Sequence, residues 1–227
     1  MSKSKKNYPE PTRILEDYGA DSLRFYLLSS PVMNADNLNF SEREVEEVYK
    51  KVMLLLYNVN RFYNQYREHD SGEEIDSDNI MDKWILARLN KTIKEVEEYM
   101  KNYNTVKATW KIRVFVDDLS TWYVRRSRER FNQGDKNAVA TLRKVLTEFS
   151  KVIAPVIPFV SEIIYQTIYG KEDSVHLQDW PQYREERIDE KLLNSMERVR
   201  HVVSLGLRER DKAGIGIRWP LRKAIVS

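Results

Sequence analysis

The segment from Asn104 to Gly134 decides the fold class, and it reads NTVKATWKIRVFVDDLSTWYVRRSRERFNQG. Its large apolar residues recur at intervals of three and four, which is the period of one face of an α-helix. Asn104 or Thr105 can cap the start of this helix, and the break at 132–134 ends it. The segment therefore predicts a long amphipathic helix, whose apolar stripe comprises Trp110, Ile112, Phe115, Val116, Leu119 and Trp122.

Similar patterns flank this helix on both sides. Ser41 and Glu44 form a capping box, and the apolar period that follows them predicts a helix of roughly six turns. Further helical patterns cover residues 84–100, 136–155, 158–169 and 189–213. Long helices joined by short connectors predict a mainly α protein, built as a helical bundle.

The two ends of the sequence carry other patterns. Two short helices are expected at residues 12–18 and 22–29. A strand is expected at Val175–Trp180, and more strand-like residues follow Gly216. We expect three units: residues 1–40, residues 41–187 as the helical bundle, and residues 188–227 as a last helix with the start of a further module.

The composition limits the classes of protein that need to be considered. Cysteine is absent, which excludes disulfides and thiolate metal sites, and the three histidines are widely separated. No metal site is therefore expected. No apolar run approaches the ~18 residues of a membrane span, and no secretory signal is recognisable. We predict a cytoplasmic protein with no membrane contact.

The net charge of +3 is modest, but its distribution is uneven. Residues 107–130 contain seven Lys or Arg and three Asp or Glu, a net +4, so the rest of the chain sums to −1. Four of these basic residues lie close together at the end of the predicted helix: Arg125, Arg126, Arg128 and Arg130. Clustered basic charge of this kind favours contact with a polyanion such as RNA.

The helical period separates the four arginines into two directions. Arg126 and Arg130 continue the line of Trp122, whereas Arg125 and Arg128 point towards the opposite side. One interpretation places the arginines on RNA phosphates, with Trp122 or Tyr123 stacking on a base.

The other interpretation gives these residues structural roles. It buries Arg126 or Arg130 in a pair with Asp117, Asp118 or a neighbouring helix, and places Trp122 in the core. Trp84 and Trp110 lie at core spacing and are expected to pack inside the bundle.

The first residues suggest a second anion-binding element. Met1, Ser2, Lys3 and Ser4 open a cationic, hydroxyl-bearing segment. Ammonium groups offset the charge of a polyphosphate, and hydroxyl groups donate hydrogen bonds to it. The alternative interpretation is a solvated tail, because charged and aperiodic chain ends are commonly disordered.

Long phrases of the sequence resemble class I aminoacyl-tRNA synthetases. Residues 1–30, MSKSKKNYPEPTRILEDYGADSLRFYLLSS, are similar to the Lys-Met-Ser-Lys-Ser signature loop and the stem-contact helices of the isoleucine, valine and leucine subgroup, without the first Lys. The phrases at 115–131, 174–181 and 219–224 are similar to the isoleucine enzymes in particular.

This resemblance implies the tRNA-binding part of an isoleucine–tRNA ligase, with an anticodon-binding bundle at 41–187. In the family, the Lys matched by Lys3 stabilises the triphosphate of ATP, so the full-length enzyme would use ATP with Mg. The catalytic Rossmann domain and the editing domain would be missing, so we expect no complete catalytic site, no cofactor and no activation of isoleucine by these 227 residues alone. The expected partner is isoleucine tRNA.

Two other interpretations stay open. The same domain could come from a valine, leucine or methionine enzyme. The chain could also be a helical interaction scaffold without an RNA role.

Overall fold

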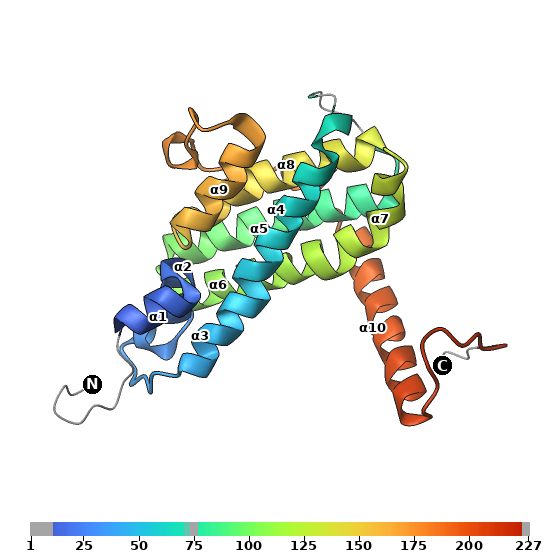
Figure 1. Ribbon diagram of the computed structural model, residues 1–227, viewed down its shortest axis with the longest axis horizontal. Coiled ribbons are helices and arrows are strands. Elements are labelled where there is room, and N and C mark those ends of the chain that lie inside the picture. The colour runs from blue at the N-terminus through green and yellow to red at the C-terminus, as the bar shows by residue number, and fades with distance from the viewer. Residues whose placement is uncertain (1–10, 71, 73–76, 224–227) are drawn as a thin grey trace.

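Two long helical rods cross the body of the protein, and each contains a wide π-helical turn (Figure 1). The computed structural model describes residues 11–70, 72 and 77–223. The first rod consists of α3 (Glu42–Val48), a π-helical segment (Tyr49–Met53) and α4 (Leu54–Tyr66). The second consists of α6 (Thr105–Asp117), a π-helical segment (Asp118–Val124) and α7 (Arg125–Asn132). These two rods are the helices that the periodicity predicts at 41–62 and 104–132.

Three further helices complete the bundle. They are α5 (Ile80–Lys101), α8 (Lys136–Ile153) and α9 (Pro158–Tyr169). Helix α5 packs against both α6 and α8, so it lies at the centre of the core. The mainly α helical bundle expected from the sequence is confirmed.

The helix boundaries follow from local capping. The Ser41 side chain accepts a hydrogen bond from the backbone N–H of Glu44 at 3.3 Å, as the capping box predicts. The Asn104 side chain caps α6 in the same way. Pro158 starts α9 and Gly170 ends it, with a φ of 98° that favours glycine.

The two short N-terminal helices are joined to the bundle by polar contacts. Helix α1 (Pro11–Tyr18) and helix α2 (Ala20–Leu28) pack beside α3 and α9 (Figure 1). The Asp21 carboxylate accepts hydrogen bonds from the first backbone N–H groups of α9, including that of Val160 at 2.7 Å. The Arg24 guanidinium donates to the carbonyl oxygens that precede α9. These contacts hold α2 against the start of α9 in the bundle.

The predicted strands are wrong. Val175–Leu177 forms a short 3-10 helix, and residues 216–223 form turns and bends, so residues 11–70, 72 and 77–223 contain no strand. Glu162 Oε2 accepts hydrogen bonds from the Ser174 hydroxyl and from the Val175 backbone N–H. A backbone N–H that donates to a side chain in this way cannot donate to a neighbouring strand.

One of the two tryptophans expected in the core lies on the surface. Trp84 is buried, whereas Trp110 is 57% exposed. On α6 the side chain of Ile112 faces the core, and Trp110 lies about 160° away from it around the helix. The Lys111 ammonium group lies over the exposed indole, 5.1 Å from the ring centroid.

Helix α10 (Glu190–Lys212) projects away from the bundle (Figure 1). The Asp189 side chain caps its start, as predicted. Leu193 is the buried residue of this helix, and Met196 packs against the core beside it. Within the described part of the chain, no helix combines the length and the apolar character needed to cross a bilayer.

Two buried tyrosines predict a loss of stability at alkaline pH. The Tyr63 hydroxyl donates to Asp70 at 2.9 Å, and the Tyr123 hydroxyl donates to Asp82 at 2.8 Å. Burial and the adjacent carboxylate raise the pKa of both phenols above the ordinary value. The unfolded chain releases these protons near pH 10, whereas the folded chain retains them. The free energy of unfolding is therefore expected to fall above pH 10, by up to about 1.4 kcal/mol per tyrosine for each pH unit.

The measurement is urea unfolding between pH 9 and pH 11. In the double variant Y63F/Y123F, neither position can ionise, so the decline above pH 10 should be shallower than in the wild type. Tyr103→Phe is the control, because Tyr103 is 90% exposed. A decline as steep in the double variant as in the wild type would show that other groups cause it.

Candidate nucleic-acid interface

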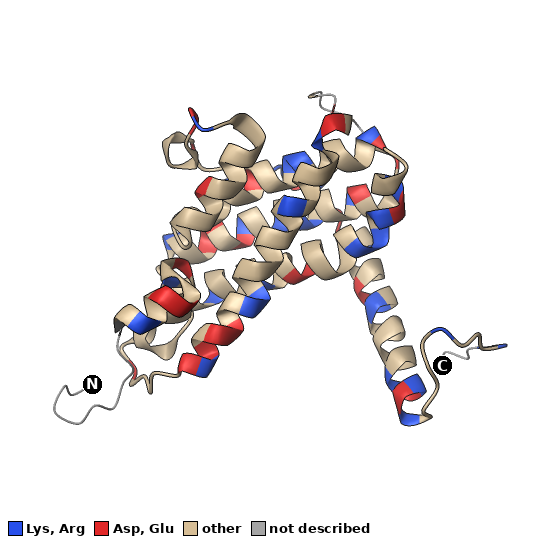
Figure 2. Cartoon of the chain, viewed as in Figure 1, with Lys and Arg blue, Asp and Glu red and all other residues tan. Residues whose placement is uncertain are grey.

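The arginines of α7 differ in their exposure to solvent. Arg125, Arg126 and Arg128 are exposed, and Arg130 is partly buried. Ser127 and Phe131 of the same helix are buried. Helix α7 therefore has one side in the core, and its exposed side carries three arginines together with Glu129 (Figure 2).

Arg125 and Arg128 line a groove between α4 and the second rod. The groove has a volume of about 740 Å³. Its lining residues are Asn58, Val59, Arg61, Phe62, Gln65, Ser120, Val124, Arg125 and Arg128. The Arg128 guanidinium lies 5.9 Å from the centroid of the Phe62 ring. Three arginines and two amides thus converge on one acid-free groove, which we call the α4–α7 groove.

Ion pairing distinguishes the arginines of this groove from other arginines of the bundle. Among the described residues, no carboxylate forms an ion pair with Arg61, Arg125 or Arg128. By contrast, Arg88 and Arg113 are paired with carboxylates. A guanidinium carries five N–H donors in a planar fork that matches phosphate geometry. The groove therefore offers its donors and its charge to an anionic ligand.

Arg130 has a structural role. It donates to both carboxylate oxygens of Asp82, at 2.9 and 2.7 Å, and to Asp135 at 2.8 Å. Asp82 is fully buried and also accepts hydrogen bonds from Ser77 and Tyr123. Arg130 is thus partly buried and paired, with Asp82 and Asp135 as its partners instead of Asp117 or Asp118.

Trp122 is packed between the second rod and α10. Its indole N–H donates to the Met196 sulfur at 3.2 Å. The guanidinium of Arg126 lies 4.7 Å from the ring centroid, and that of Arg200 lies 5.4 Å from it. Arg200 in turn pairs with Asp117 and Asp118. Trp122 thus joins α7 to α10, and Arg126 lies at that junction on the side of α7 away from the groove.

Sequence reasoning missed the α4 half of the groove. Asn58, Arg61 and Gln65 lie at intervals of three and four, so they share one face of α4. This spacing of polar residues beside the apolar stripe was the available signal. It did not reveal that α4 lies against the π-helical segment of the second rod, because the two are about 60 residues apart in sequence.

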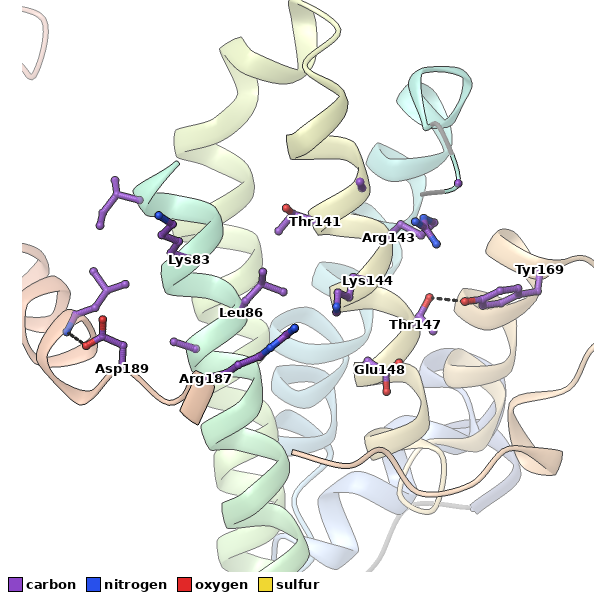
Figure 3. A pocket seen from close by; sticks show the side chains of 15 residues that line it. Lys83, Leu86, Thr141, Arg143, Lys144, Thr147, Glu148, Tyr169, Arg187 and Asp189 are labelled. Carbon is purple, nitrogen blue, oxygen red and sulfur yellow. Dashed lines mark hydrogen bonds between the residues drawn. The ribbon is translucent and has the colours of Figure 1, made fainter. Parts of the chain in front are cut away.

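A second hollow, between α5 and α8, is a weaker candidate (Figure 3). Lys83, Arg143, Lys144 and Arg187 line it together with Glu148 and Asp189. Lys83, Arg143 and Lys144 all have interaction partners. The hollow is therefore lined by both positive and negative side chains, and three of its basic residues already have interaction partners.

Two further expectations concern nucleotide binding and metal binding. Met1, Ser2, Lys3 and Ser4, the expected ATP-binding signature, lie outside the described residues. No group of three or more His, Asp or Glu side chains within the described ranges is arranged to hold a metal ion.

Comparison with known proteins identifies the family. Residues 82–225 match the family model of the anticodon-binding domain of tRNA ligase, which covers more than half of the chain. The chain belongs to this anticodon-binding family. Residues 1–39 match the model of class I tRNA synthetases for isoleucine, leucine, methionine and valine.

Relatives of this anticodon-binding chain carry the name isoleucine–tRNA ligase. The protein of Chlamydia trachomatis serovar L2b is 41% identical over 237 residues, which cover 100% of this chain and 23% of that protein. Those of Protochlamydia amoebophila and Clostridium acetobutylicum are 39% and 41% identical, with 99% and 100% of this chain covered. The resemblance to isoleucine enzymes is confirmed. The chain spans about a quarter of the length of these relatives.

A solved structure shares the fold of the anticodon-binding chain. It is the ternary complex of Agrobacterium radiobacter K84 agnB2 LeuRS with tRNA and LeuAMS, and the match has a TM-score of 0.64 at 19% identity. The match covers 83% of this chain and 23% of that one. At this identity the likeness concerns the fold alone.

Proposed function

We propose that this chain is the tRNA-binding part of an isoleucine–tRNA ligase and that it holds the anticodon stem and loop against the α4–α7 groove. The observation that carries the proposal is the convergence of Arg61, Arg125 and Arg128 on a groove without acidic residues. Membership of the anticodon-binding family gives this groove its expected ligand.

The chemistry of the groove suits a nucleic-acid loop. Guanidinium groups bind backbone phosphates, which fixes the position of the RNA without reading its sequence. The amides of Asn58 and Gln65 can donate and accept hydrogen bonds at base edges. Single-stranded loops expose those edges, which is why RNA sequence is commonly read there.

The remaining predicted contacts have different roles in this proposal. Arg126 adds a phosphate contact at the α10 side of α7. Trp122 and Arg130 act as positioning residues, because the indole packs against Met196 and the guanidinium is bound to Asp82 and Asp135. Removal of either would disturb the surface that carries Arg125 and Arg128.

The parent activity belongs to the same proposal. The full-length protein would attach isoleucine to its tRNA with ATP and Mg, in the cytoplasm, with Met1 to Ser4 as the nucleotide signature. Residues 1–40 would contact the stem, residues 41–187 the anticodon arm, and residues 188–227 would lead into a further module. The 39–41% identity with isoleucine–tRNA ligases supports isoleucine over leucine, valine or methionine.

Removal of the three groove arginines tests the proposal. In the triple variant R61A/R125A/R128A, the dissociation constant for an isoleucine tRNA transcript should rise roughly 30- to 100-fold, because three charge-assisted phosphate contacts are lost. The slope of log K against log salt should become shallower by about 2 to 3. Titrations at 50 and 200 mM salt measure both quantities.

A charge-matched variant supplies the control. Lys50, Lys101 and Lys171 are exposed residues away from the groove, so K50A/K101A/K171A lowers the net charge equally. If both triple variants weaken binding to the same extent, only overall charge matters and the groove is not the site. A non-cognate tRNA measured in parallel separates base recognition from phosphate binding alone.

A further inference from the structure

The net positive charge of the projecting C-terminal part exceeds that of the whole chain. Residues 198–223 contain eight Lys or Arg and two Asp or Glu, a net +6. The whole chain has a net charge of +3, so the remaining residues sum to −3. Figure 2 shows basic residues along α10, beyond the point where the helix leaves the bundle. The strongest local excess is therefore on a segment that contributes little to the core.

One side of α10 collects basic residues. Arg198, His201, Arg208 and Lys212 fall within about 80° of one another around the helix axis. All four are exposed. The row from Arg198 to Lys212 is about 21 Å long at 1.5 Å per residue. Leu205 falls within the same sector, Val202 lies about 40° from Arg198, and Glu197 and Glu209 lie within about 20° of the edges of the row.

The charges of this row remain available to a ligand. No described carboxylate pairs with Arg198. Arg208 and Lys212 both contact Glu209, at 3.5 and 2.9 Å, but the three side chains are well exposed. Exposed pairs of this kind contribute little to stability, so a phosphate group can compete with Glu209 for both cations.

The base of α10 is fixed on the side of α7 away from the α4–α7 groove. Arg200 pairs with Asp118, and Met196 accepts the hydrogen bond from Trp122. Arg126 lies over the same indole as Arg200. Basic residues therefore continue from Arg125 and Arg128 on one side of α7, across Arg126, to the start of α10. This continuity gives the row on α10 a definite position relative to the groove.

We propose that the basic row of α10, formed by Arg198, His201, Arg208 and Lys212, is a second RNA-contacting surface that binds backbone phosphates of the RNA held in the groove. The inference rests on the proposed function and extends it to a part of the chain outside the bundle. The row binds without base selectivity, because it offers cations and few groups that read base edges. The groove and the projecting helix together hold the RNA from two directions.

Removal of charge from the row tests this inference. In the variant R198A/R208A/K212A, the dissociation constant for the tRNA transcript should rise roughly 10-fold at 50 mM salt, and the salt slope should become shallower by about 2. The loss should be equal for cognate and non-cognate tRNA. The variant R198K/R208K keeps the charges and should bind like the wild type.

The controls separate this inference from the proposed function. K50A/K101A/K171A again supplies the charge-matched comparison, and circular dichroism checks that α10 stays helical. If the α10 variant behaves like this control while the groove variant R61A/R125A/R128A loses affinity, the inference is overturned and the proposed function stands. If neither variant differs from the control, both proposals fail.

Discussion

Replacement of Asp82 by alanine is expected to lower the free energy of unfolding by about 3 to 5 kcal/mol. Asp82 is fully buried and accepts two hydrogen bonds from Arg130 and one from Tyr123. Removal of the carboxylate leaves a partly buried guanidinium without its main counter-charge and a buried phenol without its acceptor. The desolvation cost of these groups is then no longer offset, and that cost dominates when one partner of a buried pair is removed.

Thermal unfolding measures this effect. For a chain of this size, each kcal/mol corresponds to about 2 to 4 °C, so the melting temperature should fall by roughly 6 to 20 °C. Asp78→Ala is a matched control, because Asp78 lies four residues away in sequence and pairs with Lys83 on the surface. Its effect on the melting temperature should be small by comparison, because an exposed ion pair contributes little to stability. Equal effects of the two substitutions would contradict the central role of Asp82.

The second large effect concerns Asp118, which joins α10 to the bundle. Asp118 is buried and accepts a hydrogen bond from Arg88 at 2.7 Å and another from Arg200. Asp118→Ala leaves both guanidinium groups without this carboxylate. We expect a loss of about 3 kcal/mol in the free energy of unfolding. We also expect faster hydrogen exchange in the first half of α10, because Arg200 is one of its few anchors.

Asp117→Ala provides the matched control at the adjacent position. The Asp117 side chain is 54% exposed and contacts Arg200 at 3.4 Å, so its removal should cost less than about 1 kcal/mol. Hydrogen exchange of residues 192–204, followed by mass spectrometry, distinguishes the two variants. If α10 exchanges equally fast in both, Asp118 does not hold the helix in place.

The helices could be predicted from the sequence because their signals are local. Ser41, Asn104 and Asp189 each cap a helix at the predicted position. The strand expected at 175–180 failed for a non-local reason, since its first backbone donor bonds to Glu162 of the preceding helix. The burial predicted for Trp110 is wrong because the angle of this residue around the helix points its side chain outwards, and apolar character alone does not decide burial.

The candidate site could be predicted only in part. Arg125, Arg126 and Arg128 lie on the surface as a basic cluster, and that cluster was visible in the sequence. Arg130 could not be separated from them, because its partner Asp82 lies 48 residues earlier. Arg61 could not be connected with the cluster either, because it also lies far from these arginines in the sequence. Charge density along a sequence indicates a surface, whereas the choice between ligand and structural partner depends on which helices become neighbours.

The wide turns in the two rods have a consequence for how this surface can change. Each π-helical segment, at 49–53 and at 118–124, lies close in sequence to residues that line the groove, and Ser120 and Val124 of the second segment line it themselves. A wide turn of this kind holds one residue more than an ordinary α-helical turn, so deletion of one residue there would restore ordinary α-helical hydrogen bonding and leave the downstream residues facing as before. Such a deletion after Asp118 would keep Arg125 and Arg128 on the α4 side. The wide turns therefore let each rod lose one residue without removal of the binding surface.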